Sequence, residues 1–155
     1  KERIQWFAAK QANAKDAFFV GRGIDYAISL EGSLKMKEIS YIHSEAYAAG
    51  ELKHGSISLI DKDFGVIAVV TDKEISEKTI SNLKEVESRG ANIVTITNIK
   101  DDDFSKYKIL LDDYNEVLNP LMAIIPMQLL AYNIAKLKGC DIDKPRNLAK
   151  SVTVE

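Results

Sequence analysis

Three charged side chains, Glu31, Lys35 and Glu38, occupy helical positions where apolar residues are expected. They lie in the stretch from Ile24 to His43, which reads IDYAISLEGSLKMKEISYIH. The i, i+4, i+7 spacing places two carboxylates and one ammonium on one helical face, within reach of one another. Two interpretations are open. This charged triad is either a structural ion pair between Glu31 and Lys35, or part of a site that needs a base with a tuned pKa.

The apolar residues of the same stretch predict which side of the helix is buried. At about 100° per residue they fall on one broad arc, which holds Ile24, Ala27, Ile28, Leu30, Leu34, Ile39, Tyr41 and Ile42. The charged triad lies in the middle of this arc. The opposite, polar side carries Asp25, Ser29, Ser33, Lys37 and Ser40, and His43 is assigned to that side as a structural residue. Because burying unpaired charge is costly, we expect the triad to line a wet cleft near the carboxyl ends of the strands.

Alternating strand and helix patterns surround this helix. Apolar runs predict strands at 17–20, 64–70, 92–97 and 107–111, while helical spacing predicts helices at 1–14, 73–89 and 116–138. The stretch 44–56 is predicted to be a loop with no strand before Gly50. This order predicts an α/β fold, a three-layer αβα sandwich with a parallel sheet flanked by helices. We expect one domain, 1–155, with an amino-terminal helix at about 1–14 and a carboxyl-terminal active-site tail at about 141–155.

Composition narrows the class of protein. A net charge of −2 without a basic stripe argues against nucleic acid. Neither terminus shows a basic-then-apolar signal segment, which predicts a cytoplasmic protein. The single Cys140 argues against a disulfide framework and a cysteine-rich metal site.

The apolar segment 116–138 is interrupted by Gln128, Asn133 and two prolines. This favours a buried or subunit-interface helix over a membrane span.

Two strings carry a specific likeness to a known family: LEGSLKMKEISYIHSEAYAAGELKHG and DKPRNLAKSVTVE. Together with the Gly21-Arg22-Gly23 turn, they resemble the carboxyl-terminal sugar isomerase (SIS) domain of the glucosamine-6-phosphate synthase family, the isomerizing glutamine:fructose-6-phosphate aminotransferases. The resemblance covers essentially the whole chain. It implies one of two SIS domains that convert fructose 6-phosphate and ammonia to glucosamine 6-phosphate. It implies neither a metal nor an organic cofactor.

The resemblance also implies catalytic roles for individual residues. Glu38 matches the acid/base that moves a proton between the first two sugar carbons, and His54 matches the histidine that opens the sugar ring. Lys150 matches the lysine that forms a Schiff base, while Lys35 and Glu31 match supporting charged residues. Histidine suits ring opening because imidazole titrates near neutrality, and lysine suits Schiff-base formation because an imine needs an amine nucleophile. One departure is Ser56, which stands where the family commonly has proline.

The chain is not expected to form the whole pocket. No serine- and threonine-rich loop follows a strand to bind the sugar phosphate, and no cysteine nucleophile for glutamine hydrolysis is present. The expected partners are therefore a phosphosugar substrate, an amino-terminal SIS domain and a glutaminase domain. A non-catalytic phosphosugar-binding module and a pure dimerisation domain are the alternatives.

The resemblance and the apolar segment 116–138 together predict how the subunits are arranged. We expect a homodimer that uses apolar surface of this segment. His54 would then reach the site of the neighbouring subunit, while the tail closes over the site of its own subunit. In the isolated domain we expect the tail to be ordered only in part, with Lys150 several ångströms or more from Glu38.

Overall fold

Five strands form one parallel sheet in the order β2-β1-β3-β4-β5. The structure is a computed structural model that describes residues 2–100, 104 and 106–148. The strands are β1 (Asp16–Gly21), β2 (His43–Ala48), β3 (Gly65–Val70), β4 (Asn92–Thr97) and β5 (Tyr107–Leu110). All four pairings are parallel, with Phe19 opposite Ala46 on one side and Ile67 on the other.

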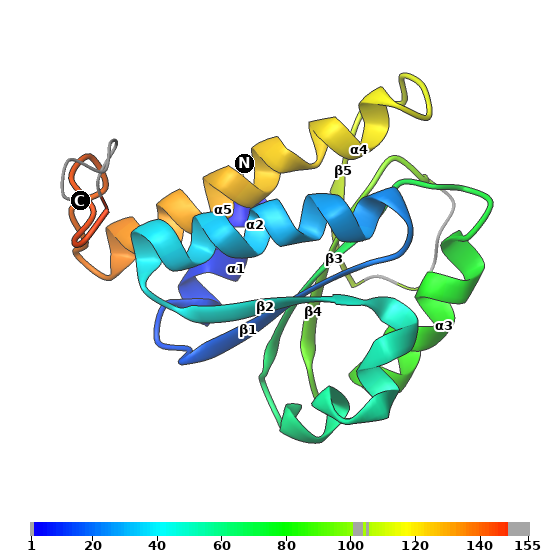
Figure 1. The fold of residues 1–155 in the computed structure, drawn as a ribbon, viewed down its shortest axis with the longest axis horizontal. Helices are drawn as coiled ribbons and strands as arrows, with labels where there is room; N and C mark the ends of the chain where they lie inside the picture. The colour runs from blue at the N-terminus through cyan, green and yellow to red at the C-terminus, as the bar shows by residue number, and fades with distance from the viewer. Residues whose placement is uncertain (1, 101–103, 105, 149–155) are drawn as a thin grey trace, which may run out of the picture.

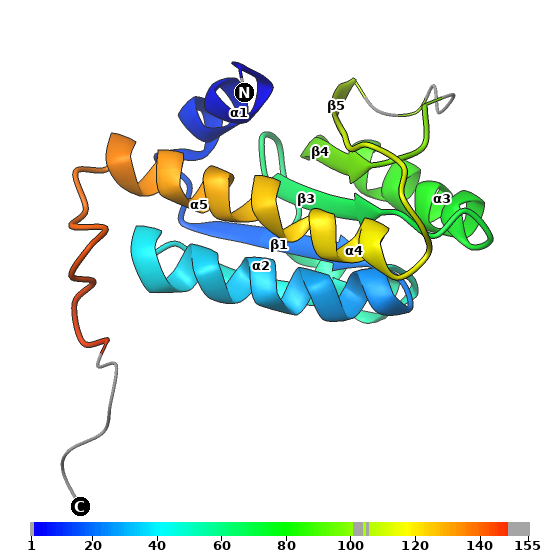
Figure 2. The same cartoon turned by 90° about the horizontal axis from the view of Figure 1, so that it is seen from above.

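Helices cover both faces of this sheet, as Figures 1 and 2 show. One face carries α1 (Glu2–Gln11), α2 (Ile24–Ser40) and α5 (Ile124–Leu137), preceded by the short α4 (Leu118–Met122). The other face carries α3 (Ser76–Glu87) and the 3-10 helices η1 (Ala49–His54) and η2 (Ser56–Leu59). The predicted αβα sandwich is therefore confirmed.

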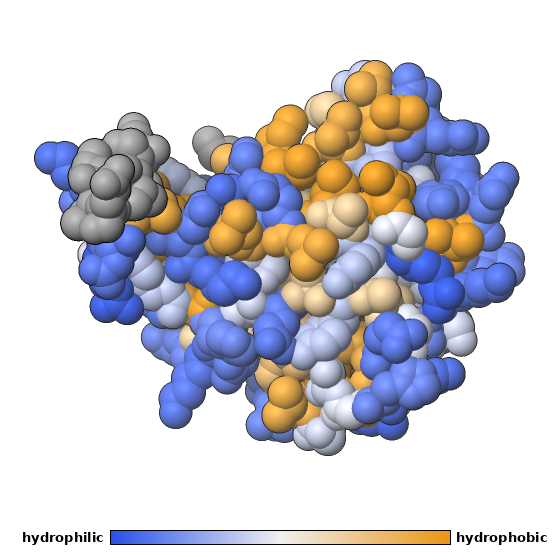
Figure 3. Space-filling model, viewed as in Figure 1, coloured by the Kyte–Doolittle hydropathy of each residue, from blue (hydrophilic) through white to orange (hydrophobic). Residues whose placement is uncertain are grey.

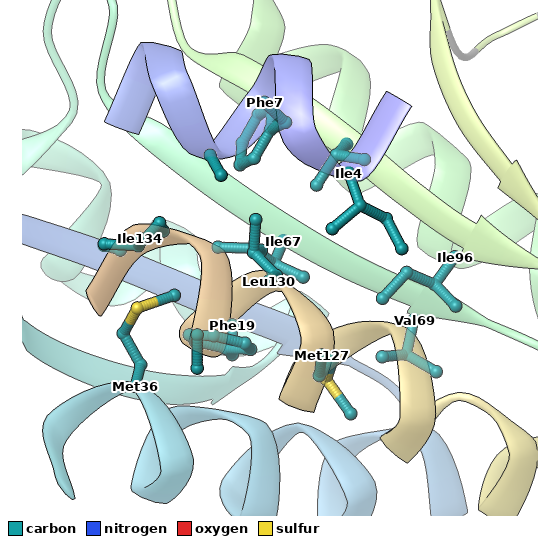
Figure 4. Packing of buried hydrophobic residues seen from close by; sticks show 14 of the residues in the cluster. Ile4, Phe7, Phe19, Met36, Ile67, Val69, Ile96, Met127, Leu130 and Ile134 are labelled. Atoms are coloured by element: carbon teal, nitrogen blue, oxygen red, sulfur yellow. The ribbon is translucent and has the colours of Figure 1, made fainter. Parts of the chain in front are cut away.

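The sheet interior is apolar because helices exclude water from both sides. All six residues of β3 are buried, and so are five of the six in β1 and in β4. On one face, side chains of α1, α2 and α5 meet those of the strands, as seen for Phe7, Met36 and Leu130 around Phe19 and Ile67 (Figure 4). The predicted face of α1 is confirmed, since Ile4, Phe7 and Ala8 are its buried apolar residues.

The predicted orientation of α2 was wrong. Its buried residues are Asp25, Ile28, Ser29, Gly32, Ser33, Met36 and Ser40, which include most of the side predicted to face water. Three of its large apolar residues are exposed: Ile24 by 53%, Leu30 by 48% and Leu34 by 42%. The helix therefore turns its small residues, together with Ile28 and Met36, to the sheet and leaves Ile24, Leu30 and Leu34 outward.

Close packing explains this orientation. A Cβ atom at Gly32 would lie 2.9 Å from the ring of Phe19 and would also clash with the Sδ atom of Met127 on α5. Only glycine fits this crossing of α2, α5 and β1 without a shift in its neighbours. Ser33 adds a specific link, because its hydroxyl donates to the backbone carbonyl of Ser44 at 2.9 Å, and the Ser44 hydroxyl donates to the carbonyl of Ser33 at 2.8 Å.

Strand β2 was not predicted. The helix ends at Ser40, Tyr41 adopts a left-handed conformation with φ 58°, and His43 begins the edge strand. His43 is therefore a strand residue, and its Nδ1 lies 2.9 Å from Oδ1 of Asp16. The burial of β2 is mixed, with only Ser44 fully buried, so it lacks the continuous apolar run that identified the central strands.

The predicted helix 116–138 is divided into α4 and α5 at Ala123. Pro126 has no backbone N–H to donate to the carbonyl of Met122, and its ring crowds that carbonyl. Length and apolar composition would also allow Leu118–Leu137 to cross a membrane, but half of that segment is buried inside the domain. Its buried side, which includes Met127, Leu130 and Ile134, packs on the sheet.

Candidate functional site

The charged triad forms an ion-paired row on the outer face of α2. The Nζ atom of Lys35 lies 2.6 Å from Oε2 of Glu38 and 3.4 Å from Oε1 of Glu31. All three side chains remain partly accessible, with 21% of Glu38 exposed. The hydrogen bond to Glu38 is the main cause that raises the pKa of Lys35 above its ordinary value. The triad is therefore not sealed in a dry core, as expected.

Its predicted position at the carboxyl ends of the strands was wrong. Helix α2 starts just after the carboxyl end of β1 and runs back along the sheet, so Glu38 lies about 20 Å further along the helix axis. The chain then enters β2, where His43 pairs with Asp16, the first residue of β1. The triad thus lies toward the amino ends of the strands, on a face that α2 turns away from the sheet.

The carboxyl-terminal segment returns to this end of α2. Arg146 donates its backbone N–H to the hydroxyl of Tyr41 at 2.9 Å, and its guanidinium lies 4.2 Å from the centre of the Tyr41 ring. Figure 2 shows the segment passing from the end of α5 across the end of α2. Arg146 is therefore held at a residue only three positions after Glu38.

The other two predicted catalytic residues are not placed beside Glu38. His54 is the last residue of η1, is exposed, and follows the carboxyl end of β2, at the opposite end of the sheet from Glu38. Lys150, the part of the predicted tail from 149 onward and the expected separation of Lys150 from Glu38 lie outside the described residues. The described chain thus brings together Glu31, Lys35 and Glu38 only.

A second polar region lies at the carboxyl ends of the strands, and sequence reasoning did not single it out. The strand order reverses between β1 and β3, where ligands of such sheets bind. Asp25, 3% exposed, accepts hydrogen bonds there from the backbone N–H of Thr71 at 2.7 Å and from its hydroxyl at 2.5 Å. Burial raises the pKa of Asp25, and the Thr71 bonds partly offset this. Its place in the first helical turn after Gly21-Arg22-Gly23 is the signal that could have identified it.

Asp113 organises the neighbouring wall of this region. It accepts hydrogen bonds from Asn98 at 2.9 Å, Asn119 at 2.8 Å and the ammonium of Lys73 at 2.7 Å. These donors, led by Lys73, lower the pKa of Asp113 to about 2. No motif marks these residues, because they come from three separate segments that only the fold brings together.

We expect Asp113 to make the stability of the chain depend on pH in the acid range. Its folded-state pKa is below the ordinary 3.8, so its contribution is present above pH 3.8 and is lost as pH falls toward about 2. The urea midpoint of the wild type should therefore fall more steeply between pH 4 and 2 than that of Asp113→Asn. Asp112→Asn is the matched control and should follow the wild type. Parallel curves for the wild type and Asp113→Asn would contradict this role.

The chain matches the model of one protein family, the SIS domain, over residues 11–137. The chain belongs to the SIS domain family. Its fold is similar to part of the structure of the C-terminal domain of glucosamine-fructose-6-phosphate aminotransferase from Francisella tularensis. That match has a TM-score of 0.84 and 40% identity, and it covers 93% of this chain and 42% of that one.

Curated relatives show which enzymes with a SIS domain the chain is similar to. The chain is 52% identical to a glutamine--fructose-6-phosphate aminotransferase [isomerizing] of Caldanaerobacter subterraneus subsp. tengcongensis and 49% identical to one of Methanosarcina mazei. Both matches cover 100% of this chain and 26% of the relative. The chain therefore spans about a quarter of the length of these relatives. The resemblance drawn from the two sequence strings is confirmed.

Proposed function

We propose that this chain is the second SIS domain of an isomerizing glutamine:fructose-6-phosphate aminotransferase. In that role it supplies reacting side chains for the conversion of fructose 6-phosphate and ammonia to glucosamine 6-phosphate. The observation that carries the proposal is the accessible charged triad on α2. The carboxyl-terminal segment returns to the end of α2 that lies nearest Glu38. The relatives that match along the whole chain bear this activity in their names.

The triad suits a carboxylate that moves a proton at carbon. Glu38 is held on a 17-residue helix, and its contact with Lys35 fixes the position of the carboxylate. Because 21% of the Glu38 side chain remains exposed, a substrate bound against this face can reach it. Glu31 contacts Lys35 from the other side, so Lys35 stays oriented when Glu38 exchanges a proton.

The proposed reaction needs an amine and a ring-opening group as well. The amine of Lys150 adds to the C2 carbonyl of the open-chain sugar with loss of water, and ammonia then displaces the lysine. Glu38 takes a proton from C1, and a proton is returned to C2, which leaves an amine at C2 and an aldehyde at C1. His54 supplies the proton transfer that opens the ring. Imine formation, removal of the C1 proton and ring opening are therefore each assigned to a residue of this chain.

The chain length after Arg146 is compatible with this role for Lys150. Lys150 follows Arg146 by four residues, which span at most about 14 Å when fully extended. Arg146 is held on Tyr41, three residues after Glu38. A Lys150 side chain can therefore reach the triad without movement of the Arg146 contact.

The remaining parts of the pocket are proposed to come from other domains and from a second subunit. Exposed apolar side chains cover the outer side of α2, α4 and α5, as Figure 3 shows. They include Leu30, Leu34, Leu121, Ile125 and Leu129. Exposed apolar side chains gathered on one face in this way favour contact with a protein surface. We assign it to the amino-terminal SIS domain or to the homodimer contact of the parent enzyme.

Subunit mixing tests the proposed division of labour. Full-length Glu38→Gln and His54→Ala enzymes should each be nearly inactive, because each lacks one reacting group. After subunit exchange, a mixed dimer should regain one competent site if His54 acts across the interface. The measurement is glucosamine 6-phosphate formation, with exchange verified by tags on the two variants. Absence of recovery despite exchange would place His54 in the same subunit as Glu38.

A further inference from the structure

Tyr41 has a backbone conformation that its residue type disfavours. It caps the carboxyl end of α2 with φ 58° and ψ 19°, in the left-handed region, where a bulky side chain is uncommon. Glycine and asparagine adopt this conformation at a helix end more easily. A strained residue persists only where the surrounding structure holds it, and such residues gather at functional sites. The contacts of the Tyr41 side chain therefore indicate what this position does.

The Tyr41 side chain holds one residue of the carboxyl-terminal segment by two contacts. Its hydroxyl accepts a hydrogen bond from the backbone N–H of Arg146 at 2.9 Å, and the guanidinium carbon lies over its ring, 4.2 Å from the centre. Within the part of the chain that the structure describes, no other hydrogen bond joins residues 141–148 to the rest of the domain. Tyr41 is therefore the attachment point of this segment on α2.

A turn at the same place sets the direction in which the chain continues. Leu148 donates its backbone N–H to the carbonyl of Pro145 at 3.4 Å, and Asn147 has φ 59°. These four residues form a β-turn, and asparagine tolerates the positive φ at its third position. Arg146 is the second residue of this turn. The residue that Tyr41 holds is thus also one at which the chain changes direction.

Attachment at Arg146 shortens the free chain that carries Lys150. Arg146 precedes Lys150 by four residues, whereas Leu137, the last residue of α5, precedes it by 13. The local concentration of a tethered group falls as about the −3/2 power of the tether length. The ratio of 13 to four residues therefore corresponds to an increase of about sixfold in the local concentration of the lysine amine. Since Tyr41 follows Glu38 by three residues, this increase applies at the Glu38 end of α2.

We propose that Tyr41 is a positioning residue of the isomerase site, which holds Arg146 so that Lys150 is presented to the open-chain sugar at Glu38. This role rests on the proposed function. In the step concerned, the lysine amine adds to the C2 carbonyl and water leaves. Tyr41 acts through Arg146 and does not touch the reacting atoms. Loss of its side chain should therefore slow formation of the Lys150 imine and leave sugar binding unchanged.

The test measures imine formation by the full-length enzyme with fructose 6-phosphate in the absence of glutamine. Borohydride adds hydride to the imine carbon and the nitrogen takes a proton from water, so the sugar stays on Lys150 as a secondary amine. Peptide mass spectrometry measures this adduct. Tyr41→Ala should form it about sixfold more slowly than the wild type does. The KM for fructose 6-phosphate should stay within about twofold of the wild-type value.

Two further tyrosine variants refine the comparison. Tyr41→Phe keeps the ring under the guanidinium and loses only the hydroxyl, so its rate of adduct formation should lie between those of Tyr41→Ala and the wild type. Tyr114→Phe is the matched control, because it removes the hydroxyl of an exposed tyrosine that follows the carboxyl end of β5. Its rate should equal that of the wild type.

Arg146 provides a second pair of variants, and because this residue is exposed they should fold even if Tyr41→Ala does not. Arg146→Lys keeps a cation for the Tyr41 ring and should form the adduct faster than Arg146→Ala does. An unchanged rate in Tyr41→Phe and in Arg146→Ala would overturn the positioning role. So would a KM that rises about tenfold in Arg146→Ala alone, because Arg146 would then bind the substrate directly. Absence of the Lys150 adduct in the wild-type enzyme is a separate result, which would overturn the proposed function and this role with it.

Discussion

Glu38→Gln in the full-length enzyme should lower glucosamine 6-phosphate formation by about 10²–10⁴-fold, the usual contribution of a general acid/base. Glutamine keeps the size of the side chain and can still accept a hydrogen bond from Lys35, so α2 should stay folded. The variant should also lose exchange of the C1 proton of fructose 6-phosphate with D2O. Both readouts follow directly from the proposed removal of that proton.

Two controls distinguish this role from a structural one. Lys37→Gln changes an exposed residue of the same helix and should retain full activity. Release of ammonia from glutamine, which the proposal assigns to another domain, should persist in Glu38→Gln. A loss of less than about tenfold in product formation would show that the triad is only an ion pair. The other interpretation of the spacing, a structural ion pair between Glu31 and Lys35, would then be correct.

Gly32→Leu should destabilise the chain by about 3 kcal/mol or more, at the upper end of the cost of overpacking. Its side chain would enter the space held by the ring of Phe19 and the thioether of Met127. The measurement is the urea unfolding midpoint. Ala27→Leu is the matched control, because Ala27 is exposed on the same helix, and it should change the free energy of unfolding by only about 0.5 kcal/mol.

Gly32→Ala tests the packing argument more finely. Helix propensity alone would stabilise the alanine variant by about 1 kcal/mol. Overpacking against Phe19 opposes this gain, and we expect net destabilisation. Because the Met127 side chain lies at the same contact, Gly32→Ala should cost less in a Met127→Ala background. A stabilised Gly32→Ala variant would show that α2 can move away from the sheet.

Several elements were predictable because local pattern and tertiary environment agree. Strand β4 was predicted with its observed bounds, Asn92–Thr97, and the predicted face of α1 is the buried one. In each case large apolar residues lie in the core, so periodicity alone identifies the element. The family was predictable for a different reason, because the two long strings that resemble it are specific in their residue order and do not depend on the fold.

The tertiary structure alone decided how α2 is oriented and what lies around it. Hydrophobic periodicity assumes that the most apolar face is buried, whereas α2 buries Gly32 and its serines so that the helix can approach β1 and α5 closely. Leu30 and Leu34 of its predicted apolar face remain exposed together with the charged triad. The sequence thus determined the family and the candidate reacting residues. Close packing of small residues determined where those side chains point, because a pattern of hydropathy carries no information about the distance between two helices.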